Sequence, residues 1–209
     1  MYKHIIWDFD GTLFDTYPVM TKAALMALEE NGIIEPYDKI FNLMKTSFST
    51  LFDYFYATYS KDVGEKVISD FYKHRRKTEA GGAKPFPYAA DVCRRICESG
   101  RYNHLCTHRG ESSIKYLREY DMLKYFSGLA TESSNFKRKP DPEALLWLMK
   151  EFDIDKSEAL MVGDRDIDIL AARNAGMDGC YYKGSPLFDC GYAKYTVTDL
   201  RQILDILEL

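Results

Sequence analysis

The sequence lacks the features that would set it apart from ordinary globular proteins. It has no long apolar run, no strong excess of charge of one sign and no Cys-x-x-Cys pair among its five cysteines. A net charge of -4 over 209 residues gives no general attraction to polyanions, so we expect no nucleic-acid partner. An odd, scattered set of thiols argues against a disulfide framework or a zinc site.

The sequence also shows no targeting or membrane signal. The first apolar stretch, residues 5–7, is too short for the core of a signal peptide and far too short for a membrane span. With 46% hydrophobic and 29% charged residues, a chain of this length can bury a substantial core. We therefore expect a cytoplasmic protein with no membrane partner, as a monomer or weak homodimer.

Residues 16–82 show helical patterns and no alternating strand. Apolar residues recur at helical spacing over 19–27 and again over 63–71, with an aromatic-rich stretch between them. The Gly- and Pro-rich segment 81–87 is typical of a linker. We expect an all-helical domain over 16–82, inserted into a second domain formed by residues 1–15 and 83–209.

From residue 88 onward, strand and helix patterns alternate. We expect strands at 104–107, 129–131, 159–162 and 179–182, with an edge strand at 195–197. Helices are expected before the first of these strands, over 88–98, and between the later ones, over 111–119, 142–152 and 167–174. This alternation predicts the α/β class, with a doubly wound parallel sheet covered on both faces.

Two carboxylates stand where the first strand ends. Asp8 and Asp10 follow the apolar run 5–7, and side chains two residues apart on an extended chain point the same way. Such a pair is costly unless a positive charge lies between the carboxylates or one of them holds a proton. A divalent cation, with one nucleophilic and one proton-shuttling carboxylate, meets that requirement.

A second pair of carboxylates follows the expected strand 159–162. Asp164 and Asp168 are one helical turn apart, which places both on one face of a helix, and Gly163 permits a sharp turn before them. In a doubly wound sheet, ligands bind at the carboxyl ends of the strands, so both pairs should meet at one edge. Oxygen-only ligation favours Mg²⁺ over zinc, and we expect Mg²⁺ as the cofactor.

The candidate substrate-binding residues are Thr107, which ends the strand 104–107, and His108 and Arg109, which follow it. The Thr107 hydroxyl could hydrogen-bond a phosphoryl oxygen, and the turn at Gly110 would bring backbone N–H groups towards the same anion. For Thr107 the alternative is a β-branched residue that ends a buried strand. For His108 the alternative is a structural hydrogen-bonding role.

Four motifs in order make the chain resemble the phosphatases of the haloacid dehalogenase superfamily with an inserted helical cap. They are Asp8-Phe9-Asp10-Gly11-Thr12, Thr107, Lys139-Pro140-Asp141-Pro142 and Gly163-Asp164-Arg165-Asp166-Ile167-Asp168. The resemblance covers essentially the whole chain and implies a Rossmann-like core with residues 16–82 as the cap. Its layout is similar to that of phosphoglycolate phosphatases. The sequence departs from the family where His108 and Arg109 follow Thr107 in place of the usual Asn.

The resemblance also implies a role for each motif residue. Asp8 would be the nucleophile that forms an aspartyl-phosphate, and Asp10 the acid and base. Lys139, chosen over Lys137 because it precedes Pro-Asp-Pro, would supply the counter-charge. The metal ligands would be Asp8, the Asp10 backbone carbonyl, Asp164 and Asp168, the last directly or through a neighbour.

We therefore predict a Mg²⁺-dependent phosphatase that acts on a small phosphorylated metabolite. One alternative is a phosphomutase of the β-phosphoglucomutase type. A receiver-like signalling module and a catalytically inactive phosphate-binding module are alternatives from another class. The receiver is disfavoured because Asp8 ends the first strand rather than a middle one and a helical insert follows.

Overall fold

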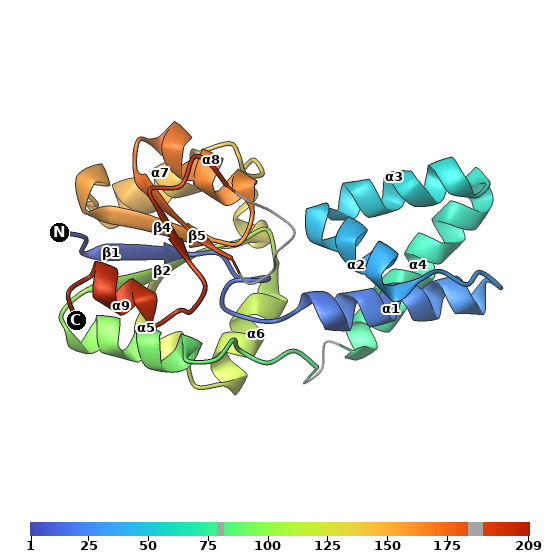
Figure 1. Cartoon of the computed structure of the whole chain (residues 1–209), viewed down its shortest axis with the longest axis horizontal. Coiled ribbons are helices and arrows are strands. Elements are labelled where there is room, and N and C mark those ends of the chain that lie inside the picture. Colours follow the sequence, from blue (N-terminus) through green and yellow to red (C-terminus); the bar gives the residue numbers. More distant parts are fainter. Residues whose placement is uncertain (79–81, 184–189) are drawn as a thin grey trace. The chain divides into compact units, whose positions relative to one another are not determined.

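The computed structural model, shown in Figure 1, describes residues 1–78, 82–183 and 190–209 and divides the chain into two compact units. The sheet unit comprises Met1–Phe14 and Pro85–Leu209, and the helical unit comprises Asp15–Lys84. Gly81, the first residue of the predicted linker, lies outside the described residues. No helix within the described ranges is long and apolar enough to cross a membrane.

Among its described residues, the sheet unit contains six parallel strands in the order β3-β2-β1-β4-β5-β6. Their bounds are β1 His4–Trp7, β2 Tyr102–Cys106, β3 Phe126–Ala130, β4 Ala159–Gly163, β5 Asp178–Tyr182 and β6 Tyr195–Val197. Trp7 of β1 pairs with Leu105 on one side and Val162 on the other. The residues that follow these three strands therefore reach the same edge of the sheet, and the predicted α/β class is confirmed.

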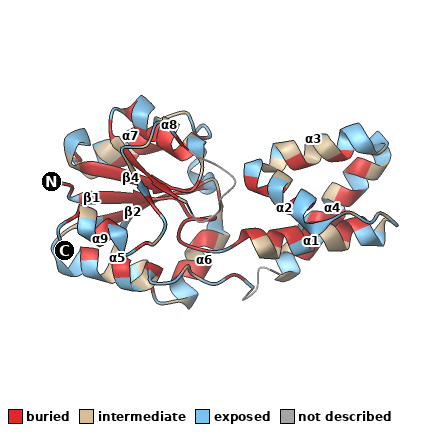
Figure 2. Cartoon of the chain, in the orientation of Figure 1, coloured by how far each residue is buried: buried red, intermediate tan, exposed pale blue. Residues whose placement is uncertain are grey.

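Helices cover both faces of this sheet, as Figure 1 shows: α7 and α8 lie on one side, and α5, α6 and α9 on the other. Their bounds are α5 Ala89–Glu98, α6 Glu111–Glu119, α7 Glu143–Glu151, α8 Asp166–Ala175 and α9 Gln202–Ile206, with short 3₁₀ turns η1 Leu123–Tyr125, η2 Glu132–Ser134 and η3 Lys156–Glu158. All four residues of β1 are buried, as expected for a central parallel strand covered on both faces. Figure 2 shows the buried strands and the exposed outer faces of the helices.

The part of the helical unit that the structure describes contains four helices around an apolar and aromatic core. They are α1 Tyr17–Glu30, α2 Tyr37–Thr46, α3 Phe48–Thr58 and α4 Lys61–Thr78. The helix α1 packs against α2 and α4, and α3 packs against the same two helices. Phe55 and Phe71 are fully buried, and the half-buried Phe52 packs against this core, so most of the aromatic stretch fills the interior of its own unit.

Two histidines form a buried polar pair on β1 and β2. His4 Nδ1 lies 3.1 Å from His104 Nε2, so one ring must donate and the other accept. His104 Nδ1 has no hydrogen-bond partner among the described residues, and its ring packs against Phe152 at a centroid distance of 4.9 Å. Burial lowers the pKa of His104 to about 4 and also lowers the pKa of His4.

These histidines should make the fold sensitive to mild acid. A histidine whose pKa is lower in the folded than in the unfolded chain favours unfolding as the pH falls below about 6.5. We expect the free energy of unfolding, measured by urea denaturation without added cations, to fall by roughly 2 kcal/mol between pH 6.5 and pH 5 through His104. The His104→Leu variant should show a shallower pH dependence, and an unchanged slope would contradict this assignment.

Candidate active site

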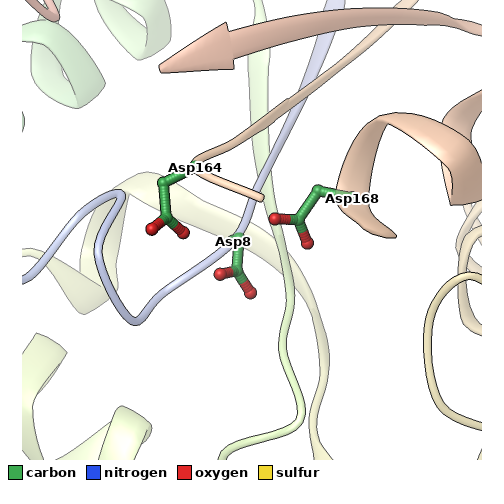
Figure 3. A group of neighbouring side chains, drawn as sticks. All are labelled: Asp8, Asp164 and Asp168. Carbon is green, nitrogen blue, oxygen red and sulfur yellow. The ribbon is translucent and has the colours of Figure 1, made fainter. Parts of the chain in front are cut away.

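Three buried carboxylates meet at the carboxyl edge of the sheet. Asp8 follows β1, Asp164 follows β4, and Asp168 lies in the first turn of α8. Each offers one carboxylate oxygen, and these oxygens lie within 4.8 Å of one another. Figure 3 shows the three side chains side by side, and all three residues are at most 2% exposed. The two sequence-predicted acidic motifs thus form one cluster.

Gly163 allows the start of α8 to come this close to the strand end. A Cβ atom at position 163 would lie 2.3 Å from Asp168 Cβ, much closer than real Cβ contacts. Asp168 Oδ2 also accepts a hydrogen bond from the Arg165 backbone N–H at 3.1 Å, so the carboxylate caps its own helix. The local chain conformation therefore fixes the position of Asp168.

Lys139 reaches into the carboxylate cluster from the loop before α7. Its Nζ lies 2.7 Å from Asp8 Oδ1 and 2.5 Å from Asp168 Oδ1, and it donates to the Cys106 carbonyl at 3.1 Å. Burial alone would lower the pKa of Lys139, but the carboxylates of Asp168 and Asp8 raise it above the ordinary lysine value. Lys139 is therefore a permanent cation, and Lys137, an exposed side chain, pairs with Asp141 instead.

The cluster still carries more negative than positive charge. Three carboxylates face two cations, the ammonium group of Lys139 and the guanidinium group of Arg165, and burial raises the pKa of Asp8 to about 6 despite the opposing effect of both. Asp8 Oδ2 accepts no hydrogen bond from the residues that the structure describes. A small, hard divalent cation fits this donor set of buried oxygens, because it would supply the missing positive charge.

The side chains of Thr107 and His108, which follow β2, accept hydrogen bonds from backbone N–H groups of the protein. Thr107 Oγ1 accepts a hydrogen bond from the Arg109 backbone N–H at 3.1 Å, and His108 Nε2 accepts one from the Lys139 backbone N–H at 2.6 Å. Burial lowers the pKa of His108 to about 3, so its ring is a neutral acceptor at ordinary pH. His108 thereby holds the loop that carries Lys139, and its contact with substrate stays a prediction.

Arg109 and Asp10 pair with each other. Arg109 Nη1 lies 2.6 Å from Asp10 Oδ1, with the arginine side chain 1% exposed and the aspartate side chain 23% exposed. Asp10 therefore remains the more accessible of the two carboxylates in the first motif, since Asp8 is 2% exposed. The sequence pattern predicted Arg109 at the substrate and gave no sign of this ion pair.

A cavity of about 180 Å³ opens between the ends of β2 and β3. Thr107 and His108 line it, together with Ala130, Thr131 and Arg138, whereas the three clustered carboxylates do not. Two of the three predicted substrate-binding residues thus border open space next to Lys139.

Thr12 is a polar neighbour of the cluster that was not among the predicted site residues. It is fully buried, and its Oγ1 lies 3.5 Å from Asp164 Oδ1, at the outer limit of a hydrogen bond. The chain turns at Gly11, whose φ of 80° suits glycine, before it reaches Thr12. Its position at the end of the first motif was the signal that could have identified it.

The fold and this site define the class of protein. The family model of the haloacid dehalogenase-like hydrolases matches residues 5–181, and the chain belongs to this family. It is accordingly an enzyme of the hydrolase class, as the family resemblance predicted.

Individual relatives are similar to the chain over its whole length. A Clostridium perfringens protein that carries the provisional name pyrophosphatase PpaX is 25% identical, covering 100% of this chain and 98% of its own. A phosphoglycolate phosphatase of Vibrio vulnificus is 27% identical, covering 98% and 95% respectively. Among solved structures, a hydrolase from Streptococcus pneumoniae is 31% identical over 98% of both chains, with a TM-score of 0.66.

Replacing Gly163 with alanine should disturb this cluster specifically. The new methyl group would displace Asp168, and we expect the affinity for Mg²⁺, measured by titration calorimetry, to fall roughly tenfold or more. Gly191→Ala is the matched control, because a Cβ atom there meets nothing within 4 Å. Equal Mg²⁺ affinity in both variants would show that Asp168 takes no part in cation binding.

Proposed function

We propose that this hydrolase is a Mg²⁺-dependent phosphatase that removes the phosphoryl group from a small phosphorylated metabolite. The proposal includes an aspartyl-phosphate formed on Asp8. It is supported first by the family and by relatives named as phosphatases, and then by the geometry around Asp8.

One observation carries the assignment of Asp8 as the nucleophile. Its Oδ1 is fixed by the Lys139 ammonium at 2.7 Å, while its Oδ2 accepts no hydrogen bond from the described residues. One oxygen is thus anchored and the other is available to attack a phosphorus atom. The ammonium group also lies where it would offset the negative charge that a bound phosphoryl group adds.

Asp10 suits the role of proton donor and acceptor. It stands two residues after the nucleophile, and its carboxylate is partly exposed, whereas that of Asp8 is buried. In the first half of the reaction, Asp10 would give a proton to the leaving oxygen as the ester bond breaks. In the second half, it would take a proton from the water that attacks the aspartyl-phosphate.

The carboxylates of Asp8, Asp164 and Asp168 would hold Mg²⁺, with the Asp10 backbone carbonyl as the family resemblance suggests. When bound, Mg²⁺ neutralises charge on the phosphoryl oxygens. Oxygen donors alone and the excess of negative charge both support this choice of metal.

We further propose that the substrate is a small phosphorylated acid of the phosphoglycolate type, and that residues 16–82 act as the cap that selects it. Relatives named phosphoglycolate phosphatase support the substrate class. The place of the helical insert directly after the first motif supports the cap. The proposal also includes a cytoplasmic monomer or weak homodimer.

The purified protein should hydrolyse 4-nitrophenyl phosphate when Mg²⁺ is present and lose this activity in excess EDTA. Asp8→Asn should reduce the rate by roughly 10³-fold or more, because it removes the nucleophile, while circular dichroism stays unchanged. Asp166→Asn is the matched control, since Asp166 is exposed at the start of α8, two residues after Asp164, and the variant should retain activity.

A panel of phosphorylated metabolites, assayed for released phosphate, then tests the substrate class. Phosphoglycolate and related phosphorylated acids should give the highest kcat/KM. Undiminished turnover by Asp8→Asn would refute the nucleophile. Conversion of one sugar phosphate into another without phosphate release would favour the mutase.

A further inference from the structure

Arg109 is a buried cation whose surroundings the proposed reaction does not yet explain. Its guanidinium carbon lies 5.5 Å from the centre of the Phe9 ring and 5.4 Å from that of Tyr116. Its Nε donates to Ser112 Oγ at 2.9 Å, and its Nη1 lies 2.6 Å from Asp10 Oδ1. Two aromatic rings and the Ser112 hydroxyl therefore restrain the guanidinium group that pairs with the Asp10 carboxylate.

The surroundings of Arg109 differ from those of the two residues before it. Thr107 and His108 line the cavity beyond β2, whereas Arg109 is absent from its lining and turns to the first motif. The arginine side chain is 1% exposed, so little of its surface is accessible to a ligand. The ion pair with Asp10 joins two loops that follow neighbouring parallel strands, β1 and β2.

We propose that Arg109 is a positioning residue that holds the carboxylate of Asp10 in the orientation needed for proton transfer. The proposal rests on the proposed phosphatase function and goes beyond the predicted substrate contact of Arg109. Its basis is the ion pair at Oδ1 together with the restraint of the guanidinium group by Ser112, Phe9 and Tyr116.

The geometry assigns different tasks to the two oxygens of Asp10. Arg109 donates to Oδ1, so the proton to be transferred is carried by Oδ2. As Asp8 forms its bond to phosphorus and the ester P–O bond breaks, the Oδ2 proton passes to the leaving oxygen. As water then bonds to phosphorus and the Asp8–phosphorus bond breaks, one proton of the water returns to Oδ2.

This role makes the effect of Arg109 depend on the leaving group. An alkyl oxygen leaves as a strong base and needs the proton from Asp10, whereas 4-nitrophenolate leaves readily without it. A carboxylate that samples several rotamers donates less efficiently, because the reacting atoms are aligned for a smaller fraction of the time. A residue that bound the phosphoryl group itself would affect both substrates alike.

The test compares kcat/KM for phosphoglycolate and 4-nitrophenyl phosphate, because this ratio reports the step that releases the alcohol. In Arg109→Met, we expect kcat/KM to fall roughly a hundredfold with phosphoglycolate and less than about fivefold with 4-nitrophenyl phosphate. Arg109→Lys should restore part of the activity with phosphoglycolate. Arg118→Met, at an exposed arginine near the end of α6, is the control and should match the wild type.

Two further variants keep the test informative if Arg109→Met does not fold. Ser112→Ala removes only the hydrogen bond that restrains Arg109 Nε. Its kcat/KM should again fall more with phosphoglycolate than with 4-nitrophenyl phosphate, but by a smaller factor than in Arg109→Met. In an Asp10→Asn background, Arg109→Lys should cost nothing more with phosphoglycolate, because the two residues act as one unit.

Equal losses with both substrates, or a raised KM with unchanged kcat, would overturn the proposal and assign Arg109 to substrate binding. Additive losses in the Asp10→Asn background would overturn it as well. Failure of the proposed function would look different, because the wild-type protein would then hydrolyse neither substrate or would not depend on Asp8.

Discussion

The ammonium group of Lys139 between Asp8 and Asp168 is the interaction on which the site depends. Lys139 and Asp8 are 131 positions apart in sequence, and the contacts of Lys139 with Asp8 and with Asp168 are both buried. The same residue donates through its side chain to the Cys106 carbonyl and through its backbone to His108, so it also ties the end of β2 to the cluster. Removing one member of a buried charge group leaves the others unpaired, which costs several kcal/mol, on the order of 3–5.

The parallel sheet supplies the framework for this interaction. Because β1 pairs in register with both β2 and β4, the chain leaves these three strands at one edge, and Asp8, Thr107 and Asp164 follow there. Helices on both faces exclude water from the strands, and this burial makes each uncompensated carboxylate costly. The need for the Lys139 counter-charge thus follows from the fold itself.

Much of this could be predicted from sequence, because strand-end carboxylates and strand–helix alternation are local patterns. The start of β3 could not be predicted. This edge strand begins at Phe126, three residues before the predicted strand, and it opens with a half-buried Phe126 and an exposed Ser127, so no apolar run marks its first residues. The ion pair between Arg109 and Asp10 and the hydrogen bond from Lys139 to His108 were not predicted. Both depend on how the loops fold back between strands, which periodicity does not encode.

Identification of the residue that is phosphorylated during turnover decides whether Asp8 is the nucleophile. The protein is mixed with Mg²⁺ and substrate, quenched in acid during turnover, and digested for tandem mass spectrometry. We expect a phosphoryl group on Asp8, in a peptide that is unmodified when substrate is omitted. Turnover with no phosphoryl group on that peptide, or with the group on Asp10, would contradict that expectation.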